Sequence, residues 1–451
     1  MCLADEFSRR ALRRISVIFG VAAYVSFIAW FYTYVADRFI AVQGYGIKEV
    51  EATVLGGSLV LAVLPAVLLP ARGKRASALL LWILYLMHVV PSVVVFPFLA
   101  DVDTSRTWVW QAFLCGSFIL TIVVASLPVA PFKIARTSPR LFFIVVSGAA
   151  IVLLATIFLA FGIDIRMSLL TQVYEQRAEF IERIQTGPAL VGYAVVLTGY
   201  WLAPVLILTG LRYWKRRRVS AIIMVLWGGI SSGYIYSVAA YKSIALVFVV
   251  VAACWWVYHN KAFSATTLLS YMGGLILVFS ALRYICDVGF PFDHLLRRAL
   301  IVPGMNAGYT FDYFSTNSLV FGAHPPSIVS SVYYGTDGSA NAGFLAAAFP
   351  RYGYLGVLAT GFVAGCVLWM VDSVTRRTEF AFAAAMFLMQ AYAMANSALP
   401  TVLVSYGLSL GILTALILPR RLDRDGTDRG LAVGQEQRPQ SERSERQGTA
   451  S

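Results

Sequence analysis

The chain has 451 residues, of which 59% are hydrophobic and only 13% are charged, and its mean hydropathy is +0.73. A soluble domain carries about 25% charged residues, so this chain has too little charge to cover a water-facing surface. The formal net charge of +13 does not indicate nucleic-acid binding, because much of the positive charge lies in short segments that flank apolar runs.

Apolar runs long enough to cross a bilayer recur along the chain, since a membrane-spanning helix needs about 20 mostly apolar residues. We therefore predict an all-α, polytopic membrane helical bundle of about twelve transmembrane helices. They are expected at residues 15–36, 52–71, 77–100, 108–130, 141–163, 188–211, 219–240, 243–259, 264–285, 352–372, 379–398 and 400–418. Pro91, Pro97 and Pro204 should kink the third and sixth of these helices.

The distribution of Lys and Arg predicts the orientation. If the N-terminus is inside and the spans alternate, the inner segments hold most of the 36 basic residues. These segments are the N-terminus, "ARGKRAS", "FKIARTSPR", "RYWKRRR", "HNKAF", "TRRTEF" and the C-terminal tail. The positive-inside rule then places both termini in the cytoplasm.

Three segments lie outside this bundle, which we take as one domain of residues 1–418. Residues 419–451 are polar and free of aromatic residues, and we expect a disordered cytoplasmic tail. Residues 164–187 have apolar residues near a period of 3.6, which is typical of an interfacial amphipathic helix that either covers a site or simply connects two spans. Residues 286–351 form one large outer loop, and loops of this length are usually functional.

Several cations fall on the outer side, against the general charge bias: Lys242, Arg283, Arg297, Arg298 and Arg351. Cations at the membrane boundary are costly unless they are paired or functional. Guanidinium groups present a planar fork of donors, so a group of them can receive a phosphate or pyrophosphate. The alternative is that each cation reaches lipid phosphates or pairs with an acidic neighbour, the candidates being Asp287, Asp293 and Asp312.

The layout resembles that of the bacterial oligosaccharide repeat-unit polymerases, the Wzy-type O-antigen and capsule polymerases, which are related in architecture to the O-antigen ligases. Besides the many spans with one late outer loop, three stretches carry the resemblance. They are "AYKSIALV", "RRALIVPGMNAGYTFDYFS" and "YYGTDGSANAGFLAAAFPRYGYLGVL". The motif-like similarity covers about residues 239–357, and the span layout covers most of the chain.

The resemblance implies a glycosyltransferase of the plasma (inner) membrane, with its active site on the extracytoplasmic side. Such an enzyme transfers a growing glycan from polyprenyl pyrophosphate to a hydroxyl of another lipid-linked repeat unit. Its partners would be these two substrates and membrane lipids, and a chain-length regulator is compatible with it. Because pyrophosphate is a good leaving group, no metal or other cofactor is expected, and fixed arginines would stabilise the charge on the departing oxygen.

On this interpretation Arg297 and Arg298 are catalytic, and Arg283, Lys242 and Arg351 bind the pyrophosphate. A base must accept the proton of the acceptor hydroxyl; His324 and Asp312 are the principal candidates and Asp293 is a further one. Sugar contacts are expected from aromatic and amide side chains of the outer loop, namely Tyr309, Tyr313, Tyr333, Tyr334 and Asn341. Each of these could instead serve packing or a turn.

Two alternatives remain open. A lipid-linked oligosaccharide flippase would also bind pyrophosphate through basic residues, but transporters usually show related halves and charged residues near the midplane of their spans. The sequence has no evident repeat, and the predicted span interiors are nearly free of charge. An O-antigen-ligase-like enzyme would share the mechanism and differ only in its acceptor.

Overall fold

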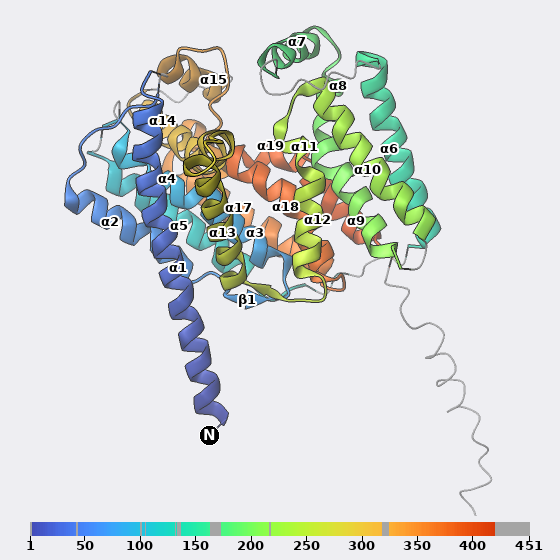
Figure 1. The fold of residues 1–451 in the computed structure, drawn as a ribbon, viewed down its shortest axis with the longest axis horizontal. Coiled ribbons are helices and arrows are strands. Elements are labelled where there is room, and N and C mark those ends of the chain that lie inside the picture. Colours follow the sequence, from blue (N-terminus) through green and yellow to red (C-terminus); the bar gives the residue numbers. More distant parts are fainter. Residues whose placement is uncertain are drawn as a thin grey trace, which may run out of the picture.

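The computed structural model describes residues 2–41, 44–99, 102–103, 105–130, 132, 137–162, 173–215, 218–317 and 324–419. This part of the chain is a bundle of helices (Figure 1), and its strands are a single pair of two residues each, β1 (Arg72–Gly73) and β2 (Phe263–Ser264). The predicted all-α helical bundle is confirmed.

Within the described residues, nine helical segments are long and apolar enough to cross a membrane, and three further apolar helices are shorter. Each of the twelve coincides with one predicted span. The long segments are α1 (Cys2–Arg38, apolar from Ala11), α3–η2–α4–η3 (Ala76–Leu84, Tyr85–Val89, Val90–Val94, Phe96–Phe98), α5 (Thr107–Ala125), α6 (Pro139–Phe161), α8–η4–α9 (Ala189–Leu197, Thr198–Leu202, Ala203–Tyr213), α10 (Arg218–Ala239), α13 (Ala265–Tyr284), α17 (Phe349–Thr375) and α19–α20 (Leu399–Val404, Leu408–Ile417). The shorter ones are α2 with η1 (Ala52–Val63, Leu64–Val67), α12 (Val247–Tyr258) and α18 (Phe380–Asn396).

The helices that contain proline are interrupted where the sequence predicts kinks. In the third span a π-helical turn, η2, comes directly before α4, which holds Pro91, and a 3-10 turn, η3, contains Pro97. In the sixth span the π-helical turn η4 precedes Pro204 in the same way. Proline lacks an N–H and its ring clashes with the carbonyl four residues earlier, and the wider π turn relieves that clash.

The extramembrane segments are sorted to opposite ends of the bundle. The N-terminus and β1 lie at one end, whereas α7 (Val173–Thr186) and α15 (Pro325–Val329) lie at the other, here called the α7 end (Figure 1). At the N-terminal end β1 pairs antiparallel with β2, and Arg212 forms an ion pair with Glu379, with Nε 3.4 Å from Oε2. These contacts join segments that the sequence analysis assigns to one side.

Charged residues of the described spans and shorter apolar helices lie within four residues of an end of the span. Asp372, near the end of α17, is 2% exposed. Its carboxylate accepts hydrogen bonds from the Ser77 amide at 2.9 Å and the Ser77 hydroxyl at 2.6 Å. Asp372 therefore satisfies free donors at the N-terminus of α3 from a helix distant in sequence.

Residues 286–351, predicted as one large outer loop of turns and short helices, are mostly helical and packed in the part that the structure describes. It contains η5 (Phe290–Ile301), α14 (Val302–Thr316), α15, η6 (Ser330–Tyr334) and α16 (Gly343–Ala346). An added Cβ at Gly304 would lie 2.5 Å from the Pro91 carbonyl oxygen, and one at Gly308 would lie 2.5 Å from Leu99 Cδ1. The Gly-rich sequence that resembles a loop is thus a close helix contact.

Helix α7 covers the ends of α6 and α10 instead of only resting on a membrane surface. Phe180 is 3% exposed, and its ring lies 5.5 Å from that of Phe161 and 5.7 Å from that of Tyr241. The Gln176 side chain donates to the Ser237 carbonyl. The predicted helix is confirmed from residue 173; residues 163–172 and the predicted tail from residue 420 lie outside the described residues.

Candidate anion-binding site at the α7 end

The segment η5 is amphipathic, and its apolar side anchors it to the bundle. Phe292 is fully buried, with its ring 5.0 Å from that of Phe31 and 5.5 Å from that of Tyr34. Leu296 and Leu300 are also buried. The remaining positions of the segment present His294, Arg297 and Arg298, which are exposed or half-buried.

Basic and aromatic side chains alternate along this face of η5. The Arg297 guanidinium lies 4.2 Å from the centre of the Phe39 ring and 5.3 Å from that of Tyr45, both within cation–π range. The His294 ring contacts Phe39 at 5.9 Å and Phe290 at 5.5 Å. Lys242, from α11 (Lys242–Ala245), places its ammonium 5.4 Å from the Phe290 ring. We call Lys242, His294, Arg297 and Arg298 the η5 cluster.

Two cations of the η5 cluster have no carboxylate counter-ion among the described residues. No carboxylate lies within ion-pairing distance of Arg297 or Arg298 in the part of the chain that the structure describes. The Arg297 Nε is also buried and has no hydrogen-bond partner there. Burial raises the pKa of the Tyr45 hydroxyl, and the charges of Arg297 and Arg298 oppose that rise. An unsatisfied buried donor is costly, and a bound anion would supply the missing acceptor.

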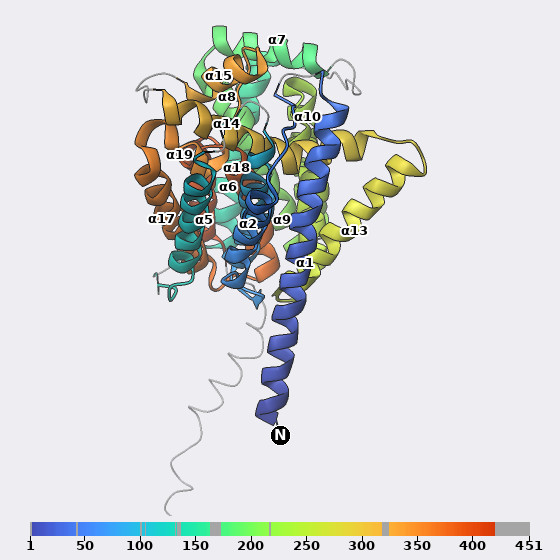
Figure 2. The same cartoon turned by 90° about the vertical axis from the view of Figure 1, so that its left-hand side faces the viewer.

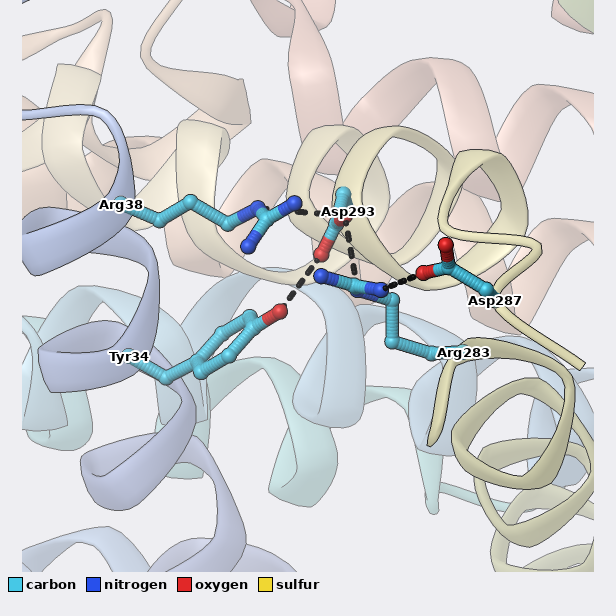
Figure 3. A network of polar contacts seen from close by, with 5 residues as sticks. All are labelled: Tyr34, Arg38, Arg283, Asp287 and Asp293. Carbon is cyan, nitrogen blue, oxygen red and sulfur yellow. Dashed lines mark hydrogen bonds and ion pairs between the residues drawn. The ribbon is translucent and has the colours of Figure 1, made fainter. Parts of the chain in front are cut away.

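Arg283 lies in a separate ion-pair network beside the cluster (Figure 3). Its Nη1 is 2.8 Å from Asp287 Oδ1, and its Nε is 3.2 Å from Asp293 Oδ2. Asp293 also contacts Arg38, with Nε 3.3 Å from Oδ2, and accepts a hydrogen bond of 2.8 Å from the Tyr34 hydroxyl. Of the two interpretations of Arg283, pairing with acidic neighbours is therefore the one present in this structure.

Tyr309 and Tyr333, two of the predicted sugar contacts, pack the outer segment. Tyr309 is fully buried, its ring stacks on Tyr333 at 4.2 Å, and its hydroxyl donates to the Gly44 carbonyl. The Tyr333 hydroxyl donates to Asp312 Oδ2 at 2.5 Å, and the Asp103 amide donates to Asp312 Oδ1 at 3.1 Å. Asp312 therefore has a structural role here, which argues against its use as a base.

The other predicted sugar contacts are half-buried, like Tyr333, or exposed. Tyr334 is half-buried and its hydroxyl donates to Asn306 Oδ1 at 2.7 Å, while Asn306 Nδ2 donates to the Asn341 carbonyl at 2.9 Å. The Asn341 side chain is exposed. Tyr313 is half-buried with its ring 4.9 Å from that of Phe314.

His324 and Arg351 are not brought to the η5 cluster by any contact among the described residues. His324 is exposed at the start of α15, and its Nδ1 lies 2.8 Å from the Ser327 hydroxyl. Arg351 is exposed in the first turn of α17. Of the five predicted cations, four lie on or beside η5 and Arg351 does not.

The residues of this site that were absent from the sequence candidates include Arg38, Tyr45 and His294. Arg38 ends α1 at the α7 end, so it could have been found as one more cation on the side that basic residues avoid. Tyr45 and His294 carry no such signal, because only the fold brings them to Arg297.

His294 should make the stability of the protein depend on pH. Burial, followed by the charges of Arg297, Lys242 and Arg298, lowers its pKa from the ordinary 6.5, while Asp293 acts in the opposite direction. Below about pH 6.5 the unfolded chain binds this proton more readily than the folded protein. The free energy of unfolding should therefore fall as the pH drops below that value, until the folded pKa is passed.

We expect His294→Gln to remove the part of the stability loss at acidic pH that comes from protonation of His294. Thermal unfolding in detergent, followed from about pH 7.5 to about pH 5, would measure it. The unfolding temperatures of wild type and His294→Gln should change in parallel at the higher pH values, and wild type should lose more stability than the variant as the pH falls. Parallel changes over the whole pH range would contradict the prediction.

No group of three or more His, Cys, Asp or Glu side chains is placed to hold a metal ion among the residues that the structure describes. Comparisons of the chain with protein-family models, with curated proteins and with solved structures find no match in any of the three. The chemistry of the site must therefore be argued from its own residues.

Proposed function

We propose that this protein is a membrane glycosyltransferase that polymerises polyprenyl-pyrophosphate-linked oligosaccharide repeat units into a cell-surface polysaccharide. In this proposal the α7 end faces the outside of the plasma membrane, both termini are cytoplasmic, and the η5 cluster binds the pyrophosphate of the donor.

The observation that carries the proposal is the pair Arg297 and Arg298, which has no carboxylate partner among the described residues. Arg212, at the opposite end, also has a buried Nε without a hydrogen bond, but it is matched by Glu379. Arg297 has no such counter-ion among the described residues, and its guanidinium lies over the Phe39 and Tyr45 rings. A preorganised, unneutralised guanidinium is what a departing pyrophosphate requires.

The reaction breaks the bond between the anomeric carbon of the donor glycan and the pyrophosphate oxygen. The acceptor hydroxyl oxygen forms the new bond to that carbon and loses its proton to a base, and the pyrophosphate leaves with the bonding electrons. Arg297 and Arg298 would stabilise its developing charge, with Lys242 as a further cation. Of the two principal base candidates, Asp312 is engaged by two donors, and His324 makes no described contact with the η5 cluster, so the base is not assigned to either.

The positions of the charges favour this proposal over a flippase. Transport of a pyrophosphate across the bilayer would need polar or charged groups along the path. In the described spans the charged residues lie within four residues of an end of the span, which suits chemistry at a membrane surface.

Reconstitution tests the proposal. The purified protein in liposomes, supplied with a polyprenyl-pyrophosphate-linked repeat unit on one face, should produce glycans of several repeats and release polyprenyl pyrophosphate. Movement of intact repeat units across the bilayer without elongation would identify a flippase. Transfer of a single glycan to a different lipid acceptor, with no repeat-to-repeat products, would identify a ligase-like enzyme.

A further inference from the structure

Asp293 is the point at which three elements of the site converge. It is 4% exposed and belongs to η5, while its partners Tyr34 and Arg38 come from α1 and Arg283 from α13 (Figure 3). The Tyr34 hydroxyl donates a hydrogen bond to Oδ1, and both arginines form their ion pairs with the other oxygen, Oδ2. One carboxylate thus serves as the shared counter-ion of two guanidinium groups.

Asp293 does not satisfy all the hydrogen-bond donors of Arg38 and Arg283. The ion pairs of Arg38 and Arg283 with Oδ2 are made through Nε, at 3.3 Å and 3.2 Å. The Arg283 Nε is buried and has no hydrogen bond of proper geometry within the described chain. The second partner of Arg283, Asp287, has a side chain that is 95% exposed, and such a pair contributes little in water.

The same η5 segment carries Arg297 and Arg298 four and five positions after Asp293. The side chain of Arg38 is 45% exposed, so a ligand can reach it from the α7 end. Helix α13, which precedes η5, has only 6% of its spanning window buried and tilts away from the bundle at the end that leads into η5 (Figure 2). An anion held at Arg297 would therefore lie about one helical turn from two more guanidiniums that share the Asp293 Oδ2 oxygen.

We propose that Asp293 is a resident counter-ion, which the pyrophosphate group of the substrate displaces from Arg38 and Arg283. These two arginines would then complete a four-guanidinium site with Arg297 and Arg298. The inference rests on the proposed function, and it adds Arg38 to the substrate-binding residues.

Charge and hydrogen bonding both favour the exchange. A pyrophosphate that links a lipid to a sugar carries two negative charges and more anionic oxygens than a carboxylate, so it can offer each guanidinium a paired contact. Asp293 would keep the hydrogen bond from Tyr34 to Oδ1, so its carboxylate is not left without a donor. Substrate binding would in this way loosen the ionic link between η5 and α13.

The decisive experiment compares the affinity of the purified full-length protein for farnesyl pyrophosphate, measured by calorimetry in detergent, in wild type and in Asp293→Asn. Asparagine has the shape of aspartate and can still accept from Tyr34, but it does not neutralise the arginines. If Asp293 competes with the ligand, Asp293→Asn should bind farnesyl pyrophosphate more tightly, by about tenfold. If Asp293 only fixes the arginines in place, the same variant should bind more weakly, and weaker or unchanged binding overturns the inference.

A second variant keeps the test decisive if Asp293→Asn does not fold. Arg38→Gln changes a side chain that is nearly half exposed, and it should weaken binding by about tenfold; unchanged binding would overturn the inference. The two proposals fail differently. If wild type does not bind farnesyl pyrophosphate at all, the pyrophosphate site itself is refuted and both proposals fall. If wild type binds and Arg297→Gln does not, but Asp293→Asn fails to bind more tightly, only the exchange is refuted.

Discussion

Arg297→Gln and Arg298→Gln, made singly, should each lower the rate of glycan polymerisation by about 100-fold or more. Removing one preorganised donor from a developing oxyanion typically costs about 10²–10³ in rate, and glutamine retains a donor but not the charge. Arg297 should show the larger effect, because its guanidinium is fixed over Phe39 and Tyr45 whereas Arg298 is exposed. The rate would be measured as repeat units joined per protein molecule in reconstituted liposomes.

Arg106→Gln is the matched control, since Arg106 is another exposed arginine close to the outer segment. Its Nη1 donates to the Ser315 carbonyl at 2.9 Å, a bond that a glutamine amide can replace, and it has no described contact with the η5 cluster. This variant should polymerise at nearly the wild-type rate. Equal losses in all three variants would indicate a general need for surface charge, and wild-type rates in Arg297→Gln would remove the basis for placing the pyrophosphate at η5.

The spans could be predicted from the sequence because their signal is local. Hydropathy over about 20 residues decides whether a helix can cross the bilayer, and even the crowded pair around "AYKSIALV" resolves into α10 and α12 with the short α11 between them. The prolines were informative for the same reason, since the steric conflict of Pro91 and Pro204 lies within one turn of each residue.

The outer segment was harder to predict, because its residues have two interpretations that only the fold separates. Gly304, Asn306 and Gly308 have the composition of a turn, yet they lie on a buried helix that packs against the third span. The sequence cannot show that the third span offers a backbone surface close enough to require glycine.

The site was predicted in part for a related reason. The position of Arg283, Arg297 and Arg298 in one segment between apolar spans is a sequence property, and it selected the segment that carries the η5 cluster. Which of them is neutralised is a property of the fold, because Arg38 and Tyr34 reach Asp293 from the first span. The sequence therefore located the cations but could not separate the paired arginine from the two that have no described counter-ion.

Gly304→Ala should destabilise the protein by about 1–3 kcal/mol, the usual cost of overpacking a rigid contact. The added methyl group would lie 2.5 Å from the Pro91 carbonyl oxygen and 2.6 Å from its carbonyl carbon. These are backbone atoms of a buried helix, so neither can move aside as a flexible side chain would. Helix α14 continues directly from η5, and its displacement should also disturb Arg297 and Arg298.

Gly116→Ala provides the matched control in the middle of α5, where an added Cβ would meet no atom within 4 Å. Because alanine favours a helix over glycine by up to about 1 kcal/mol, this variant should be as stable as wild type or slightly more so. Thermal unfolding of both variants in the same detergent compares the two sites directly. A Gly304→Ala protein as stable as Gly116→Ala would mean that α14 does not pack against the third span, and the placement of the η5 cluster beside the bundle would then lose its support.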